Sequence, residues 1–324
     1  MTPTEPDRID LGKICSRRLA SRPSKVEHDM LVKSAIAGES LRAFLVNLPH
    51  QLGGNQLRGL VGAIVNAQRK GLPVILGCGA HLIKLGLGPH LCRLVESNVI
   101  THIAANGAFY IHDWEMARAG KTSEDVASAL LEGEFGMAVE TAVEMNQAVV
   151  DGVKQGWGIG YSLGKRLLEI GGDYLNSSVL ATAARAGIGI TAHIAIGAEI
   201  IHQHPSFSGA AWGEGSHLDF RQFAGEVSRM SNGGLYVNVG SAVIMPEVFL
   251  KALSVAKNQD TKLGNIVTAN LDMIRHYRPL QNVLKRPALL GGQTFEIIGQ
   301  LEFTLSLLCY GVLEELRDPW SALK

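Results

Sequence analysis

Small and titratable residues recur in this chain directly after short apolar runs, and the stretch PVILGCGAHLIKL is the first example. The apolar residues 74–76 are followed by Gly77, Cys78 and Gly79. A dinucleotide-binding fingerprint would place a third glycine at position 82, where this chain has Leu82. The two glycines could let a ligand approach the backbone, or they could serve only a tight turn between a strand and a helix.

Four further connections between predicted elements carry similar residues. Carboxyl ends of parallel strands meet at one edge of a sheet, so these side chains would lie together. Small residues there let a ligand approach, and polar residues orient it. Five such connections in succession predict a ligand site. The other four contain, in chain order, Asn106, Gly107, His112, Asp113 and Glu115; His193, Gly197, Glu199, His202 and His204; Asn238, Gly240 and Ser241; and Asn270, Asp272, Arg275 and His276.

Acidic residues in these connections allow more than one interpretation. Asp113 and Glu115 could be catalytic groups, or acids at a helix N-terminus where the helix dipole favours negative charge. Asp272 follows an apolar strand, and an acid in that position suits a ribose hydroxyl. We interpret Cys78 as a small buried residue, because no partner that would stabilise a thiolate is evident.

Histidines in the third connection raise the alternative of a metal site. His202 and His204 would lie on one face of a strand, and His193 and His217 are close in sequence. Imidazole is the commonest zinc ligand, and bound zinc would generate hydroxide for a hydrolase or lyase. The spacing lacks a diagnostic third ligand, so we predict no metal and keep a transition metal as the alternative.

The composition narrows the class of protein. The 324 residues are 46% hydrophobic and 19% charged, which predicts a large buried core. Basic and acidic residues are equal at 30 each, so no overall charge attracts nucleic acid or a membrane. The amino terminus has no signal-peptide pattern, and no apolar run approaches the roughly 20 residues that span a bilayer. The four scattered cysteines fit a reducing compartment, so we expect a cytoplasmic protein.

Apolar runs alternate with helical patterns along most of the chain. Strands are predicted over 74–76, 100–104, 188–192, 235–239, 266–269 and 294–297. Helices are predicted after Pro89, from a Thr122 cap to Gly133, over 135–155, and from Ser177 to Gly187. This alternation predicts an α/β fold with a mostly parallel sheet. Residues 1–30 are predicted to form an N-terminal arm, and residues 31–324 a single α/β domain.

Several segments resemble the deoxyhypusine synthase family. The segment LGCGAHLIKLGLGPHLCRLVESNVITHIAANGAFYIHD is similar to that family's first strand–loop–helix–strand unit. Three others follow in the family's order: SSVLATAARAGIGI with Gly197, GLYVNVGSAVIMPEVFLKAL, and TANLDMIRHYRP. The resemblance covers residues 70–115, 176–200 and 233–286, which is around half of the chain.

The resemblance implies a Rossmann-like, doubly wound sheet that binds NAD, and assembly as a homotetramer. It also implies NAD-dependent transferase chemistry on a small amine or polyamine, including transfer of an alkylamine group. Acids for the ammonium groups would be Asp113, Glu115, Glu199 and Asp272. Carried over by position, the cofactor-binding residues would be Gly77, Gly79, Ala80, His81, Asn106, Gly107, Gly240, Ser241, Thr268, Ala269 and Asp272.

The family's catalytic lysine follows Trp-Gly, and Trp-Gly-Lys does not occur in this sequence. A lysine is needed because only an amine condenses with the oxidised substrate to form an imine. Lys285 is either a displaced equivalent or a surface lysine, and authentic deoxyhypusine synthesis is not expected. The candidate catalytic residues are Lys285, His204 and Asp113. The alternatives are the metal-dependent hydrolase or lyase with His193, His202 and His204, and a non-catalytic ligand-binding protein.

Overall fold

Six apolar segments form one sheet in the computed structural model, which describes residues 8–260 and 262–319. Every neighbouring pair of strands is parallel, and their order is β3-β2-β1-β4-β5-β6. All six predicted strands are present, with ends shifted by at most three residues. The predicted α/β fold with a Rossmann-like, doubly wound sheet is confirmed. The strands are β1 (Val74–Cys78), β2 (His102–Asn106), β3 (Gly189–His193), β4 (Leu235–Val239), β5 (Val267–Asp272) and β6 (Thr294–Ile298).

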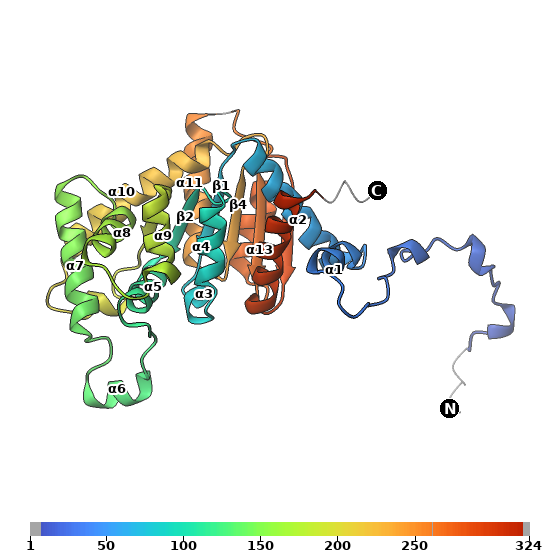
Figure 1. The fold of residues 1–324 in the computed structure, drawn as a ribbon. Coiled ribbons are helices and arrows are strands. Elements are labelled where there is room, and N and C mark those ends of the chain that lie inside the picture. Colours follow the sequence, from blue (N-terminus) through green and yellow to red (C-terminus); the bar gives the residue numbers. More distant parts are fainter. Residues whose placement is uncertain (1–7, 261, 320–324) are drawn as a thin grey trace, which may run out of the picture.

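Helices cover both faces of this sheet (Figure 1). On one face lie α2 (Leu52–Arg69), α4 (Gly88–Glu96), α9 (Val179–Ala186) and α13 (Leu301–Arg317). On the other lie α10 (Gly209–Ser228) and α11 (Ile244–Gln259). The remaining α-helices are α1 (Leu41–Asn47), α3 (His81–Lys84), α5 (Gly107–Ala119), α6 (Val126–Glu132), α7 (Val139–Lys154), α8 (Ile159–Ile170) and α12 (Arg286–Ala288). Shorter segments are the 3-10 helices η4 (Leu175–Ser177) and η5 (Ile200–Gln203) and the π-helical η6 (Pro279–Lys285).

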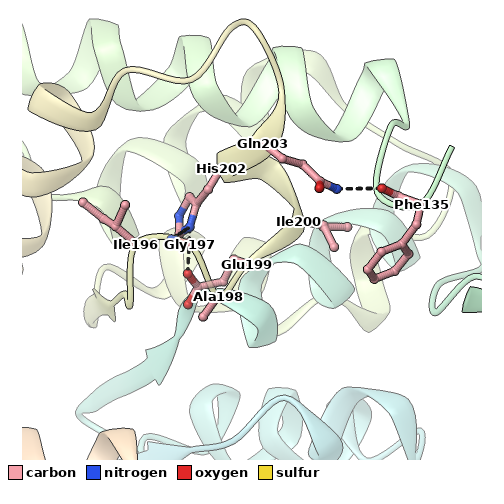
Figure 2. A pocket seen from close by; sticks show the side chains of 8 residues that line it. All are labelled: Phe135, Ile196, Gly197, Ala198, Glu199, Ile200, His202 and Gln203. Carbon is pink, nitrogen blue, oxygen red and sulfur yellow. Dashed lines mark hydrogen bonds and ion pairs between the residues drawn. The ribbon is translucent and has the colours of Figure 1, made fainter. Parts of the chain in front are cut away.

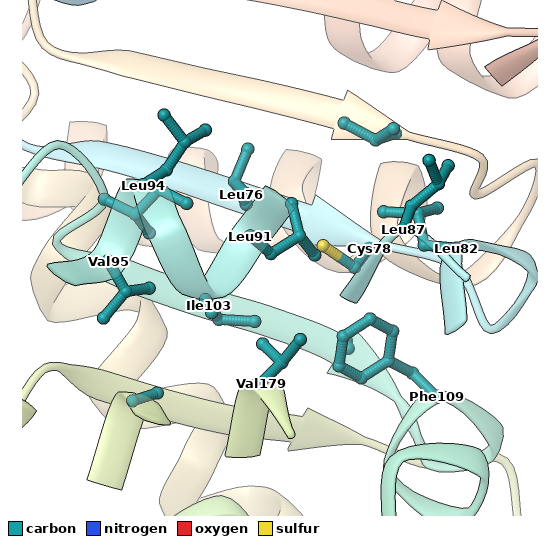
Figure 3. Close-up of a cluster of buried hydrophobic side chains, with 14 of the residues drawn as sticks. Leu76, Cys78, Leu82, Leu87, Leu91, Leu94, Val95, Ile103, Phe109 and Val179 are labelled. Atoms are coloured by element: carbon teal, nitrogen blue, oxygen red, sulfur yellow. The ribbon is translucent and has the colours of Figure 1, made fainter. Parts of the chain in front are cut away.

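The core on the α4 side is mostly apolar. Figure 3 shows Leu76 and Cys78 of β1 packed with Leu91 of α4 and Ile103 of β2. Burial raises the pKa of the Cys78 thiol to about 12, so it remains protonated. The structure therefore agrees with the interpretation of Cys78 as a small core residue.

On the opposite face of the sheet, two histidines and a threonine of β2 and β3 form a buried polar cluster. Nε2 of His102 lies 2.9 Å from the Thr191 hydroxyl, and Nε2 of His193 lies 3.1 Å from the same oxygen. Both rings contact Phe223 of α10. Burial lowers the pKa of each histidine to about 3, so both stay neutral structural residues.

Helix ends follow the predicted signals with two corrections. Gly133 and Gly187 end α6 and α9 in the left-handed region, with φ of +72° and +68°. The N-cap of α6 is Asp125, whose carboxylate accepts the N–H of Ala127, and the predicted Thr122 cap was wrong. The hydroxyl of Thr122 is engaged elsewhere, as described below. Residues 135–138 precede α7 rather than belonging to it.

The residues before α1 extend away from the body (Figure 1). They contain the 3-10 helices η1 (Leu11–Lys13), η2 (Leu19–Ser21) and η3 (His28–Met30), and residues 8–29 are exposed. The first seven residues of the predicted arm lie outside the described residues, and the division between arm and domain stays a prediction. Over residues 8–260 and 262–319, no helix combines the length and apolar character needed to cross a bilayer.

Candidate functional site

The carboxyl ends of the parallel strands share one edge, and the strand order reverses between β1 and β4. At this reversal a Cβ built on Gly79 would lie 1.9 Å from the carbonyl oxygen of Gly240. Within β1, a Cβ on Gly77 would lie 2.0 Å from the hydroxyl of Tyr236 in β4. Close packing between neighbouring strands therefore requires both glycines, which is a different reason from either of the two considered from sequence.

Beyond β1 and β2, the predicted cofactor residues lie at this carboxyl edge. Ala80 and His81 lead into α3, and the side chain of His81 is exposed. Asn106 ends β2 and caps α5 through its side-chain oxygen. Gly107 begins α5 and lies directly against the carboxylate of Glu199. A Cβ at this position would come within 2.9 Å of the Glu199 side chain. The edge next to β2 is thus built closely around Glu199.

Beyond β4 and β5, the predicted cofactor residues separate into two groups. Ser241 follows β4, and its Oγ accepts the N–H of Met245 at 3.2 Å. Asp272 ends β5 at the edge. Thr268 and Ala269 are buried in the first half of β5. A strand rises about 3.3 Å per residue, so Thr268 lies roughly 13 Å below Asp272 and does not reach the edge.

Two hollows that share a wall lie beside the ends of β2 and β3. Their volumes are about 270 Å³ and about 200 Å³, which suits a small molecule better than a dinucleotide. The larger is lined by Phe135, Ile196, Gly197, Ala198, Glu199, Ile200, His202 and Gln203 (Figure 2). The smaller is lined by Lys84, Ala108, Ile111, His112, Glu115, Ser123, Glu124, Val126, Phe135, Ala198, Glu199 and Ile200.

Glu199 and His202 form a buried pair on the wall of the larger hollow (Figure 2). Nδ1 of His202 lies 3.2 Å from Oε2 of Glu199 and 3.0 Å from the backbone nitrogen of Gly197. Only 4% of the His202 side chain and 5% of the Glu199 side chain are exposed. Nδ1 accepts the N–H of Gly197, so its single lone pair is occupied, and Oε2 of Glu199 has no hydrogen-bond partner among the described residues. A proton could pass from Glu199 to Nδ1 only if the Gly197 N–H released that lone pair.

Burial affects both members of the pair. It raises the pKa of the Glu199 carboxyl, against hydrogen bonds from backbone N–H groups, and it lowers the pKa of His202. The His202 ring packs against the rings of Phe207 and Trp212, and its Nε2 has no hydrogen-bond partner among the described residues. Burial therefore brings the proton affinities of the Glu199 carboxylate and the His202 imidazole closer together than they are in water.

The smaller hollow has an acidic wall. Oε2 of Glu115 accepts the hydroxyl of Thr122 at 2.5 Å, and Nδ1 of His112 lies 2.7 Å from the same hydroxyl. Burial lowers the pKa of His112, and the nearby Lys84 adds to this effect, so the imidazole stays neutral. Glu124 lines the same wall. Lys84 is exposed at its rim and supplies a primary amine.

The three predicted catalytic residues do not meet in these hollows. Asp113 points its carboxylate at the start of α9 and is fully enclosed there. Nδ1 of His204 lies 2.8 Å from the hydroxyl of Ser206. Lys285 is exposed in η6, which packs on β5, three strands from β2. Neither hollow is lined by any of the three. Each belongs to a different packing unit, and a catalytic role for them stays a prediction.

Other lining residues were missed from sequence. The loop pattern had already pointed to His112, Glu115, Glu199 and His202, whereas Glu124, Phe135 and Gln203 were not considered. Two of the missed residues, Glu124 and Phe135, lie on either side of α6, where the sequence has no motif that indicates a ligand site. The available signal was charge: residues 122–143 contain five acids and no lysine or arginine.

The histidines do not assemble the alternative metal site. His193 is buried under α10, His202 pairs with Glu199, and His217 is exposed on α10. In the part of the chain that the structure describes, no three His, Cys, Asp or Glu side chains are placed to hold a metal ion. A metal-dependent hydrolase or lyase at these histidines therefore lacks its ligand set.

Comparison with known proteins identifies relatives by fold. No family model and no curated protein matches this chain. AgrE in complex with ornithine and NAD+ is similar with a TM-score of 0.54 and 13% identity, over 82% of this chain and 33% of that chain. A LOR/SDH protein from Methanococcus maripaludis S2 has a TM-score of 0.54 and 14% identity, over 82% and 69%. A protein of Entamoeba histolytica assigned as a deoxyhypusine synthase has a TM-score of 0.50 and 12% identity, over 86% and 94%.

These similarities concern the fold. This chain spans about a third of the length of AgrE and most of the Entamoeba histolytica protein. At such low identity they support a related fold family, and the resemblance to deoxyhypusine synthases is supported at that level. The chain thus has the parallel α/β fold that these proteins share.

Proposed function

We propose that this protein is an enzyme that uses NAD to oxidise a small amine or polyamine held in the acidic hollows beside Glu199 and His202. The buried Glu199–His202 pair at the carboxyl edge of the sheet carries the proposal. A protein of similar fold was crystallised with ornithine, a small amine, and NAD+. Authentic deoxyhypusine synthesis is not included, because the Trp-Gly-Lys motif is missing. Assembly as a tetramer and a cytoplasmic location stay predictions.

The walls of the two hollows suit a cationic substrate. Glu115, Glu124 and Glu199 all line the smaller hollow, and Glu199 also lines the larger one. Carboxylates bind an ammonium group through charge-assisted hydrogen bonds, which are strengthened where water is excluded. Ile111, Phe135 and other apolar lining residues would contact the carbon chain.

Glu199 and His202 would supply the proton transfer that amine oxidation needs. A protonated amine must lose a proton before a hydride can leave the adjacent carbon. Glu199 would accept that proton, because its raised pKa makes it a stronger base than an ordinary carboxylate. His202 would receive the proton across the 3.2 Å contact. Bound NAD would supply the hydride acceptor, and loss of hydride from the carbon next to the nitrogen would leave the substrate as an iminium ion.

Residues at the reversal of strand order and on the neighbouring strand β5 support the proposal of this cofactor. Ala80 is small and follows β1, and the exposed His81 lies next to it. Ser241 follows β4, and the Asp272 carboxylate at the end of β5 suits a ribose hydroxyl. We assign NAD to these four residues, with the amine in the neighbouring hollows.

Transfer of an alkylamine group requires a lysine near the iminium carbon. Lys84 lines the smaller hollow, so we assign this role to Lys84 in place of Lys285. Its neutral amine would attack the iminium carbon, form a new C=N bond and release the original nitrogen as an amine or ammonia.

Absorbance of reduced nicotinamide tests the proposal. Protein mixed with NAD and ornithine, putrescine or spermidine should show an amine-dependent rise. Glu199→Gln should slow this rise by roughly 100-fold, because a general base is lost. Glu169→Gln, an exposed change on α8, should leave it unaltered. No reduction with any amine, or equal rates in both variants, would refute the proposed function.

A further inference from the structure

The N-terminal arm, defined here as residues 8–37, exposes an unusual amount of apolar surface. Its aliphatic side chains are each more than half exposed. Burial of such side chains against a partner surface would remove this apolar area from water, which is favourable. The exposed side chains are Ile9, Leu11, Ile14, Leu19, Val26, Leu31, Val32 and Ile36.

The arm is also strongly basic, although the whole chain is neutral. The arm contains seven basic residues and only three acids. The basic residues are Arg8, Lys13, Arg17, Arg18, Arg22, Lys25 and Lys33, and the acids are Asp10, Glu27 and Asp29. A partner surface for the arm should therefore be apolar and acidic.

One surface of the chain has both properties. Residues 122–143, here called the acidic lobe, comprise α6 and the segments on either side of it. The lobe contains five acids and no lysine or arginine. Six of its apolar side chains are exposed: Val126, Leu130, Leu131, Met137, Val139 and Val143. Within the described residues, α6 has no buried side chain at all.

The arm and the acidic lobe project from opposite ends of the molecule, with the whole sheet between them (Figure 1). We infer that the arm of one copy of this chain packs on the acidic lobe of a second copy. Two copies related by a two-fold axis would exchange arms reciprocally, and each contact would pair basic with acidic residues around an apolar centre.

Cross-linking through the native Cys15 tests this contact. Cys15 is exposed in the arm, and the other three cysteines are buried. A tagged chain with native Cys15 is mixed with an untagged chain carrying Cys15→Ser and Leu131→Cys, and both are treated with a short bismaleimide. A mixed tagged–untagged dimer should form. The matched control is Leu289→Cys, because Leu289 and Leu131 are both 86% exposed. The Leu131→Cys pair should cross-link on the order of tenfold more.

Charge reversal tests the proposed complementarity. Arg17→Glu with Arg18→Glu in the tagged chain should reduce the cross-link, and Glu132→Lys with Glu134→Lys in the untagged chain should restore it. Arg221→Glu, an exposed change on α10, should have no effect. High salt should weaken the native contact.

Three results would overturn the inference. The first is equal cross-linking at positions 131 and 289. The second is a cross-link that forms inside one chain when Leu131→Cys is combined with native Cys15 in a third variant, with none between the tagged and untagged chains, which would mean that the arm folds back on its own lobe. The third is a cross-link that is insensitive to charge reversal, or none at all at concentrations where the chain self-associates.

Discussion

Asp113 in α5 and Ser178 at the start of α9 are joined by a buried hydrogen bond of 2.6 Å from the Ser178 hydroxyl to the Asp113 carboxylate. The same carboxylate accepts the N–H groups of Val179 and Leu180, each at 2.9 Å. An acid from one helix thus satisfies the first N–H groups of another. Sequence reasoning placed Asp113 either in catalysis or at the start of its own helix, and neither describes this contact.

Asp113→Ala should destabilise the fold by about 2–4 kcal/mol, because three buried donors lose their acceptor. Urea unfolding followed by circular dichroism measures this. The matched control is Asp173→Ala, an exposed change in the segment before α9, which should cost about 0.5 kcal/mol or less. Equal losses in the two variants would contradict the assignment.

Gly79→Ala should destabilise the protein by about 1–3 kcal/mol, because its Cβ would overlap the carbonyl of Gly240. Gly62→Ala is the control, since a Cβ there meets nothing within 4 Å in the interior of α2. That change should stabilise by about 0.5–1 kcal/mol, because alanine is the better helix former. Thermal unfolding of both variants decides the matter. A Gly79→Ala protein as stable as the parent would show that the sheet edge is loosely packed.

The stability of the fold should depend on pH through Asp219 of α10. Its Oδ2 accepts the N–H groups of Gly160 and Ala192 at 3.0 and 2.8 Å, and burial raises its pKa to about 7. In the unfolded chain an aspartate has a pKa of about 4. Between these values the folded state keeps a proton that the unfolded state has released. The stabilising contribution is therefore present at low pH and is lost as pH rises towards about 7.

Asp219→Asn should remove this dependence while keeping an acceptor oxygen for the two N–H groups. The free energy of unfolding of the variant relative to the parent should rise between about pH 4 and about pH 7, by up to about 4 kcal/mol. Urea titrations across this range provide the measurement. Parallel pH profiles for the two proteins would mean that the carboxyl is already ionised in the folded state.

Borohydride trapping distinguishes the two candidate lysines. An imine formed during amine turnover should be reduced onto Lys84, which lines a hollow, and not onto Lys285, which is exposed beyond β5. Peptide mass spectrometry locates the adduct. Lys84→Ala should abolish it, and Lys285→Ala should leave it intact. An adduct on Lys285 would restore the original prediction.

Local signals were sufficient for the framework of the molecule. The central strands β1 and β4 are almost purely apolar, and their ends differ little from prediction because burial on both faces requires that composition. Gly133 and Gly187 end helices where expected, because left-handed backbone favours glycine. Thr122 and Asp125 are both good cap residues by type, and only the folded chain shows that Thr122 bonds Glu115 while Asp125 caps α6.

The sequence by itself determined a parallel α/β sheet with polar connections at one edge, since side-chain type and periodicity are local properties of the chain. Tertiary structure decided which of those polar groups share a hollow. Glu199 and His202 meet each other, whereas Asp113, His204 and Lys285 are directed elsewhere. Glu124 and Phe135 reach the same hollow from the segments around α6. Convergence of this kind depends on how distant segments pack, and no local pattern of residues encodes it.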